Sequence, residues 1–405
     1  MARRAEIPAL TGLRGIAALC IVLNHYAANF APFAWDTAPP WLMTVFSTSG
    51  FGMTLFFTLS GFVITYNYFD FPWADAPLRS LVRFGWLRFS RLYPLLFVFM
   101  LLRTDWKTFD LWTLLHFAGV ETWLPLKFAG AIPMHGRFNV SWSISVEFGL
   151  YIFFALAMIA GAFLYRRGKL HWLVGLAGAY ALGMLTLIAW PQAQQPILSH
   201  LPSPMEPLTA NETWVWLFYQ SPYYRVVEFA LGACAAVLVM RSPPWLRPDA
   251  VFLHLLPAAG IAALFVVHWQ HFPGLQITHR IEAIQLVTAV VCALVMLTGR
   301  LGGWLATGLS WRPLVLIGEC SYSLYMMFLS AAAISGIGPI QQPFALDLLP
   351  WYGVRLAWGL LIALAVAWGF YRVVERPAQA ALRAIGPQAK PATFREMPTL
   401  PQAAE

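Results

Sequence analysis

Two ionisable residues in the first apolar stretch, Arg14 and His25, lie eleven positions apart. At about 100° per residue, they fall within roughly 20° of one helix face and about 16 Å apart along the axis. That span is comparable with a pantetheine arm, so Arg14 would hold a phosphate while His25 acts as general base at a thioester. The alternative is topological: Arg14 reaches toward one interface and His25 lies at the other.

A second basic group, Arg83, Arg88 and Arg91, precedes the sequence Leu92-Tyr93-Pro94. Arginines three positions apart converge on one side of a helix, which suits a multiply charged phosphate group. The same residues would also supply the positive charge typical of cytoplasmic membrane flanks. Position alone leaves both interpretations open.

A carboxylate, Glu147, stands about two turns inside an apolar segment that opens at Ser141 and continues to Leu164. Such a group would orient or charge-balance a histidine. It would equally complement the positive end of a helix near its N-terminus. The histidines show no recognisable metal-ligand spacing, and the chain carries no serine-hydrolase or nucleotide-binding motif, so no metal is assigned.

Membrane-spanning helices must position these residues. Of the 405 residues 59% are hydrophobic and 11% are charged, against roughly 25% charged residues in soluble domains. The apolar blocks are long enough to cross a bilayer and lack the alternation of barrel strands. We expect an all-α, polytopic membrane protein with about ten transmembrane helices, near 9–30, 43–68, 81–103, 141–165, 170–190, 223–240, 251–269, 280–299, 313–338 and 352–375.

Charge between the apolar blocks predicts the topology. If both termini are cytoplasmic, 18 of the 26 Lys and Arg residues fall on the inner side, as the positive-inside rule requires. The basic residues are dispersed, which argues against nucleic-acid binding. We expect one membrane domain over 1–380, a short interfacial or re-entrant helix within 104–140, and a disordered cytoplasmic tail over 381–405.

Six stretches together resemble the acyltransferase-3 family of bacterial membrane O-acyltransferases. The first helix of that family carries an Arg, ten intervening residues and a His, as this chain does. The matching stretches are Thr11–Gly15 with Leu23–His25, Phe56–Ile64, Arg88–Pro94, Ser143–Glu147, Ser321–Tyr325 and Glu375–Pro377. Taken in order, these stretches extend over nearly the whole chain.

The resemblance implies transfer of an acyl group from cytoplasmic acyl-coenzyme A to a hydroxyl of a glycan, lipopolysaccharide sugar or small acceptor. We expect the acyl group to be short, acetyl or succinyl. It also implies a bacterial inner membrane, with acyl-coenzyme A as co-substrate and no tightly bound cofactor. The site residues implied are His25 and Glu147 as catalytic, Arg14, Arg88 and Arg91 as donor-binding, and Ser60, Ser143 and Tyr322 as site lining.

The chain departs from the family pattern in one segment and leaves two alternatives open. Many relatives place a His shortly after the segment matching Ser321–Tyr325, where this chain has Met326-Met327-Phe328. We also expect no C-terminal esterase-like domain. Direct transfer and an acyl-histidine relay both remain compatible with the sequence. A glycan or lipid transporter is the rival function, although repeats with matching broken helices are not evident.

Overall fold

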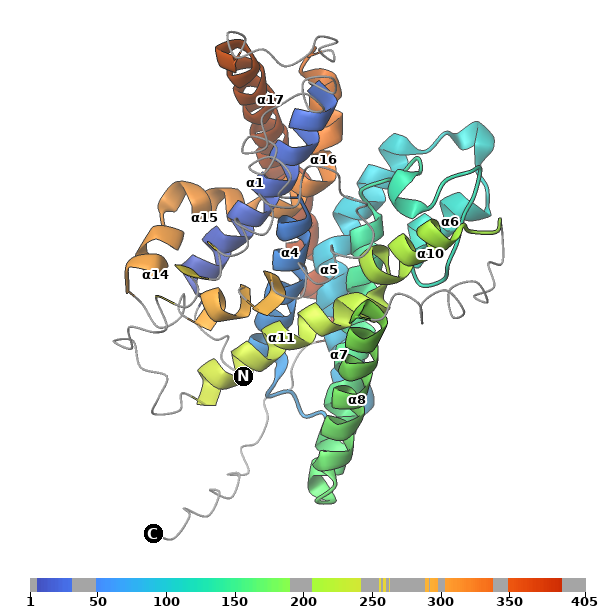
Figure 1. Ribbon diagram of the computed structural model, residues 1–405, viewed down its shortest axis with the longest axis vertical. Coiled ribbons are helices and arrows are strands. Elements are labelled where there is room, and N and C mark those ends of the chain that lie inside the picture. The colour runs from blue at the N-terminus through green and yellow to red at the C-terminus, as the bar shows by residue number, and fades with distance from the viewer. Residues whose placement is uncertain are drawn as a thin grey trace.

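A computed structural model describes residues 6–30, 49–189, 206–241, 303–337 and 349–387, with a few positions between 255 and 297. Helices make up the architecture of this described part, and its only β feature is one isolated bridge, between Phe128 and Ala131. The all-α prediction is therefore confirmed (Figure 1). The long helices are α1 (Pro8–Phe30), α4 (Ser49–Tyr68), α5 (Pro77–Arg103), α7 (Trp142–Arg166), α8 (Leu170–Ala189), α11 (Pro222–Arg241), α16 (Ser321–Ile334) and α17 (Leu349–Phe370).

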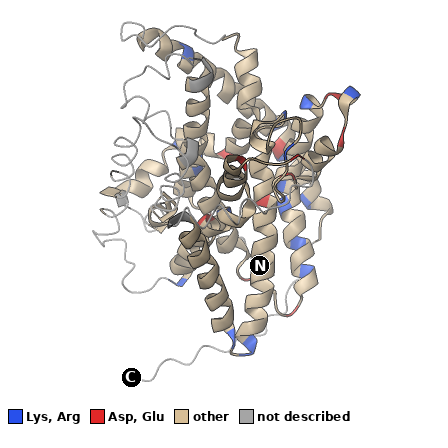
Figure 2. Ribbon diagram, turned by 45° about the vertical axis from the view of Figure 1, so that its right-hand side comes forward, with Lys and Arg blue, Asp and Glu red and all other residues tan. Residues whose placement is uncertain are grey.

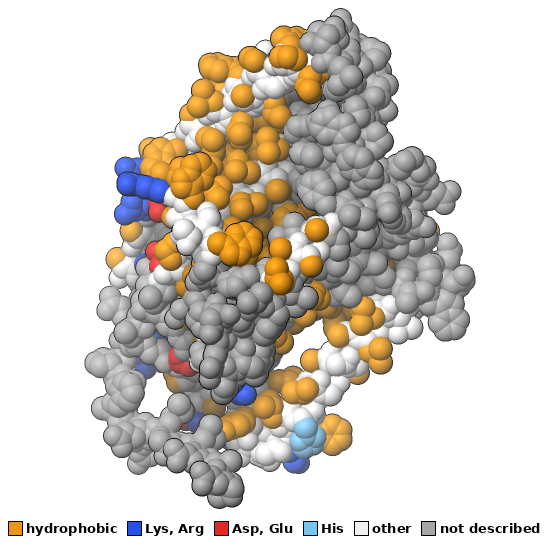
Figure 3. All heavy atoms as spheres, turned by 60° about the vertical axis from the view of Figure 1, so that its left-hand side comes forward, with side chains coloured by type: hydrophobic (Ala, Val, Ile, Leu, Met, Phe, Trp, Pro, Cys, Tyr) orange, Lys and Arg blue, Asp and Glu red, His pale blue; other side chains and the backbone are white. Residues whose placement is uncertain are grey.

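Six helices of the described part are long and apolar enough to cross a membrane, and a bent pair makes a seventh candidate. Many of their large apolar side chains face outward. On α8, for example, Trp172, Val174 and Leu176 are each more than 60% exposed, which water would penalise and lipid tails would not. Hydrophobic side chains likewise cover the described helices on the face in Figure 3. The chain is a multi-pass membrane protein.

Most expected spans within the described residues are helices at or near their expected positions. The spans expected at 251–269 and 280–299, and residues 43–48 of the second, lie largely or wholly outside the described residues. Helix α4 is present at the expected position but is not among the six helices that meet the length and hydropathy criteria for a membrane span. Two of its hydroxyl groups bond to other helices, Thr54 to Glu228 of α11 and Ser60 to Glu147 of α7.

The span expected over 313–338 is not one straight helix. Helix α15 (Arg312–Glu319) and α16 meet at Cys320 with a bend of 75°. The carbonyl of Gly318, near the end of α15, accepts hydrogen bonds from Arg14 Nε and Ser321 Oγ, both at 2.9 Å. These side chains satisfy a carbonyl that a continuous helix would pair internally, so the helix can break here inside the protein.

The C-terminal helix continues beyond the expected end of the last span. After α17 come a π-helical turn, η6 (Tyr371–Glu375), and α18 (Arg376–Ile385). Helix α18 packs on α5, where the Trp86 indole donates a 2.8 Å hydrogen bond to the Leu382 carbonyl. Residues 381–385 thus belong to the folded domain, and 388–405 lie outside the described residues.

Close helix crossings centre on α4, which packs between α1 and α11 (Figure 1). At the α4–α11 crossing, a Cβ added to Gly61 would lie 1.9 Å from the Phe229 carbonyl oxygen, and one added to Gly232 would lie 1.8 Å from that of Thr58. Small residues let the two backbones touch, as is typical of helix packing in membranes. This crossing fixes the helix that carries Ser60.

The segment 104–140 forms a compact cap beside the first turn of α7, with the predicted short helix present as α6 (Leu111–Ala118). Asp110 caps its first turn through Thr113, and Gly119 ends it with a left-handed φ of 66°. The cap is joined to α7 by Thr122, which donates to Ser145 Oγ at 2.8 Å. Alongside it pack α10 (Ala210–Val215) and the π-helical η3 (Trp216–Gln220), and the Trp216 indole bonds the Thr122 carbonyl.

The α7–α8 hairpin extends away from this cap, and its tight turn holds Arg166, Arg167 and Lys169. Arg166 forms an exposed ion pair with Asp75 at 2.5 Å. In Figure 2 basic residues colour the ribbon at the lower end of the helices, and residues of both charge signs colour it around the cap. The cytoplasmic side of this tip, and of both termini, stays a prediction from the positive-inside rule.

Candidate functional site

A cavity lies between α1, α4, α5, α7 and α16, and it contains about 770 Å³ of non-protein space, its open mouth included. Seven of the eight site residues expected from the sequence line it: Arg14, Ser60, Arg88, Arg91, Ser143, Glu147 and Tyr322. Five separate stretches of the chain contribute these side chains.

Hydrogen bonds and ring contacts between the helices mark the two ends of the cavity. At one end, Arg88 bonds Tyr68 and its guanidinium lies over the Tyr68 and Tyr151 rings. Midway, Ser60 bonds Glu147. At the other end, Phe57 packs on Trp142, the residue before Ser143, with ring centroids 6.4 Å apart. We call these the arginine end and the aromatic end.

The arginine end holds three guanidinium groups. Arg14 donates to the Gly318 carbonyl, and Arg88 is buried, donates to the Tyr68 hydroxyl and leaves its Nε without a hydrogen bond. Arg91 is half-buried and forms no hydrogen bond or ion pair with any described residue. Within the described chain, none of the three has a carboxylate within ion-pair distance. Unpaired cations in a cavity suit a multiply charged anion.

Glu147 lies midway along the cavity and is held by two hydroxyl groups. Its Oε1 accepts from Ser60 at 3.0 Å and from Tyr151 at 2.6 Å. The structure does not pair Glu147 with His25, so the carboxylate does not orient that ring here. Its charge instead lies between the arginine end and the aromatic end, close enough to act on Arg14 and Arg88.

The bend at Cys320 brings the first turn of α16 to the cavity. Tyr322 lines the wall and donates a 2.7 Å hydrogen bond to the Leu92 carbonyl of α5. Behind it, Ser323 donates to Glu375 Oε2 at 2.6 Å, and the Ser323 amide also bonds this carboxylate. The π-helical turn η6 thereby places a buried acid at the N-terminus of α16, where a negative charge is favourable. The sequence motif Glu375-Arg376-Pro377 marked this position without revealing its partner.

His25 lies outside the cavity lining. Its side chain is exposed, and its ring packs on Phe328 with centroids 5.1 Å apart. Phe328 in turn packs on Tyr325, which does line the cavity, with centroids 6.3 Å apart. Two aromatic rings therefore connect His25 to the aromatic end of the cavity.

Sequence reasoning left open which acid within the helices pairs with a neighbouring arginine, and the structure shows a buried ion pair between Arg225 and Glu228, both fully enclosed and 2.6 Å apart. Thr54 of α4 donates to Glu228 at 3.1 Å, and Arg225 lies over the Phe57 ring. The i, i+3 spacing within an apolar helix was the available signal. Tyr151, which lines the cavity, gave no such signal, because tyrosine is common in apolar segments. Tyr325, which also lines it, ends the matching stretch Ser321–Tyr325 but was not singled out as a site residue.

Comparison with known proteins agrees with this geometry. The sequence profile described as an acyltransferase domain, Acyl_transf_3, matches residues 7–372. The chain is 29% identical over 341 residues to "Acyltransferase MdmB" of Streptomyces mycarofaciens, which covers 80% of this chain and 79% of that protein. No solved structure matches significantly. The matched region includes every cavity-lining residue and His25, and the chain belongs to the acyltransferase-3 family of acyltransferase enzymes.

Proposed function

We propose that this enzyme transfers a short acyl group, acetyl above all, from cytoplasmic acyl-coenzyme A to a hydroxyl group of a glycan, a lipopolysaccharide sugar or a small acceptor. The observation that carries the proposal is the arginine end of the cavity, where Arg14, Arg88 and Arg91 have no carboxylate within ion-pair distance in the part of the chain that the structure describes. Acyl-coenzyme A has phosphate groups at one end and its thioester at the other. A bacterial inner membrane is the proposed location.

The donor would enter with its phosphates at the arginine end. Arg91 is the principal contact because its guanidinium is uncommitted, while Arg88 offers its unpaired Nε and Arg14 reinforces the positive charge. Charged hydrogen bonds to phosphate are worth about 1.5–3 kcal/mol each. Ser60, Ser143 and Tyr322 line the path along which the pantetheine arm would lie.

Transfer would take place at the aromatic end, toward His25. The acceptor oxygen attacks the thioester carbonyl carbon while His25 takes the hydroxyl proton. The carbon–sulfur bond then breaks, and the coenzyme A thiolate receives that proton from the histidine. An acyl-histidine relay would balance equally. The imidazole nitrogen attacks first and expels the coenzyme A thiolate, which takes the ring N–H proton, and the acceptor hydroxyl then displaces the imidazole, which keeps the hydroxyl proton.

Glu147 would balance charge within the cavity. Its carboxylate offsets the arginine end when no donor is bound, and the Ser60 and Tyr151 hydroxyls keep it in place. We propose charge balance in place of the other role considered from the sequence, in which Glu147 orients the His25 ring. Charge balance predicts that Glu147→Gln retains the fold, since an amide oxygen accepts the same two hydrogen bonds.

The proposal is tested by following radiolabelled acetyl groups from acetyl-coenzyme A into total glycan and lipid fractions. Membranes holding the intact protein, a His25→Ala variant or a His171→Ala control are compared at matched abundance. His171 is an exposed histidine near the start of α8, so its variant should match the intact protein. The proposed reaction and the role of His25 are supported if acetyl label appears only with the protein and falls at least about a hundredfold in His25→Ala. A loss of that size is within the range of general-base catalysis. Equal label with all three proteins contradicts it.

A further inference from the structure

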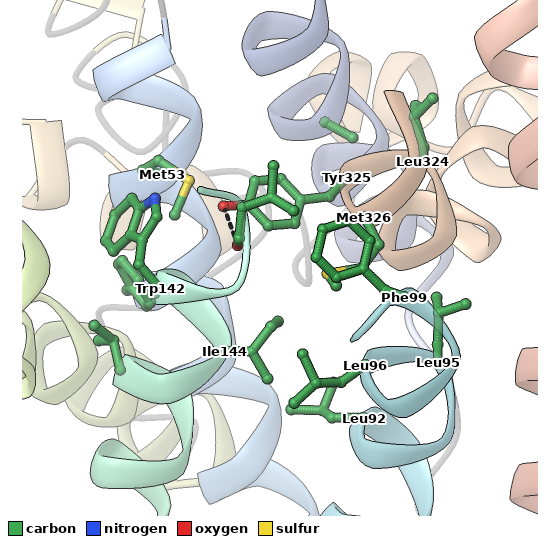
Figure 4. Packing of buried hydrophobic residues seen from close by; sticks show 14 of the residues in the cluster. Met53, Leu92, Leu95, Leu96, Phe99, Trp142, Ile144, Leu324, Tyr325 and Met326 are labelled. Carbon is green, nitrogen blue, oxygen red and sulfur yellow. Dashed lines mark hydrogen bonds between the residues drawn. The ribbon is translucent and has the colours of Figure 1, made fainter. Parts of the chain in front are cut away.

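The aromatic end of the cavity differs in chemistry from the arginine end. Met53, Phe56, Phe57 and Tyr325 surround it, and Figure 4 shows Met53, Ile144, Leu92 and Tyr325 lying around the same space. The rings of Phe56 and Tyr325 meet edge to face, with centroids 6.4 Å apart. A group placed here would touch apolar surface on most sides, as an acyl chain would and a phosphate would not.

Phe328 closes this end toward His25. Its side chain is 1% exposed, and its ring contacts both Tyr325 inside the cavity and His25 beyond it. A centroid separation of 5.1 Å from the His25 ring is van der Waals contact, which leaves no room for a methylene chain between the two rings. An acyl carbonyl that reaches His25 would therefore have Phe328 beside it.

Hydrogen bonds hold both rings of this wall in place. Tyr26, the neighbour of His25 on α1, donates to the Phe328 carbonyl at 2.7 Å. Tyr325 donates to the Val140 carbonyl at 3.0 Å, the dashed line in Figure 4. The same turn of α16 is thus tied to α1 on one side and to the cap segment on the other. A wall fixed at both ends cannot widen cheaply to admit a longer chain.

We propose that Phe328, supported by Tyr325, is the residue that restricts the donor to a short acyl group. The inference rests on the proposed function, since it needs a thioester carbonyl at His25. Alanine in place of Phe328 would leave space about the size of a phenyl ring beside His25, where the thioester carbonyl carbon would react. Each methylene accommodated or rejected by an apolar pocket changes discrimination by roughly 10–200-fold at most.

The test is a competition between two donors in one reaction. Membranes receive tritiated acetyl-coenzyme A and radiocarbon-labelled hexanoyl-coenzyme A together, and the ratio of the two labels in glycan and lipid gives the ratio of kcat/KM values. That ratio is independent of how much protein folds. Phe328→Ala and the milder Phe328→Leu are compared with the intact protein. Phe154→Ala is the matched control, because Phe154 is buried in contact with Phe84, away from the cavity.

We expect the hexanoyl-to-acetyl ratio to rise about tenfold or more in Phe328→Ala, to rise less in Phe328→Leu and to stay unchanged in Phe154→Ala. An unchanged ratio in both Phe328 variants, with acetyl transfer still measurable, overturns the inference and leaves the proposed function standing. Transfer of neither label by the intact protein overturns the coenzyme A donor and the inference together.

Discussion

Two arginine sites within the helix bundle differ in how their charge is balanced. At the α4–α11 crossing, Arg225 is fully enclosed and pairs with Glu228 at 2.6 Å. In the cavity, Arg88 and Arg91 have no carboxylate within ion-pair distance among the described residues. A buried cation that has its partner in the chain serves packing, whereas one left without a partner is available to a ligand.

The surroundings of the two sites agree with this division. Arg225 lies over the Phe57 and Tyr219 rings, and Gly232, on the same helix, closely approaches the Thr58 backbone. Arg91 lines a cavity instead and is half-buried. The comparison therefore predicts that changes at the first site affect folding, while changes at the second affect binding.

Removing the acid of the enclosed pair should have the largest effect. Glu228→Ala leaves the Arg225 charge buried and unpaired, which typically costs about 3–5 kcal/mol of unfolding free energy. Arg91→Ala removes a half-buried side chain that forms no ion pair with a described residue, and it should change stability by less than about 0.5 kcal/mol. Thermal unfolding of the two purified variants in one detergent measures the difference. Equal destabilisation would remove the distinction between the two sites.

A glycine substitution tests the crossing that encloses Arg225. In Gly232→Ala the new Cβ would lie 1.8 Å from the Thr58 carbonyl oxygen, so α4 and α11 must separate at a cost of about 1–3 kcal/mol. Gly85→Ala on α5 is the control, since no atom lies within 4 Å of its added Cβ. The control should be neutral or slightly stabilising. If Gly232→Ala unfolds at the temperature of the control, the crossing is not as tight as the structure describes.

Glu121 in the cap extends the comparison to a buried acid that forms no ion pair with any residue the structure describes. Burial raises its pKa from 4.5 to about 8, and Ser141 donates to it at 2.8 Å. The folded state thus holds the proton more tightly than the unfolded state. Its stabilising effect is complete below the ordinary pKa of 4.5 and is lost as pH rises through about 8.

The expected readout is a fall in unfolding temperature of a few degrees for the intact protein between about pH 5 and pH 8.5. Glu121→Gln, which imitates the protonated acid, should lose that part of the pH dependence. Parallel profiles for the two proteins would show that Glu121 is ionised in the folded state at neutral pH.

The sequence predicted the long helices because hydrophobic length is a local property. The bend at Cys320 escaped prediction because it depends on Arg14, which lies far away in sequence and bonds the Gly318 carbonyl. Helix α18 escaped because its fold depends on a contact with Trp86 of α5. Composition placed the domain boundary at 380, whereas tertiary packing extends the helix to Ile385.

The sequence predicted which residues form the site but not how they are arranged in space. Motif order identified seven residues that do line one cavity. The shared helix face of Arg14 and His25 suggested one common chamber, yet Phe328 lies between the cavity wall and His25. Side chains from α16 decide that separation, and spacing within the first helix carries no information about them.

The central claim, that the arginine end binds the phosphates of coenzyme A, is tested most directly by a binding cycle. Isothermal titration calorimetry compares coenzyme A with pantetheine, which lacks the nucleotide phosphates, on the intact protein and on Arg91→Ala. We expect Arg91→Ala to weaken coenzyme A binding by about tenfold to a hundredfold, the equivalent of one charged hydrogen bond, and to leave pantetheine binding unchanged. Equal losses for both ligands, or no loss for coenzyme A, would contradict the account.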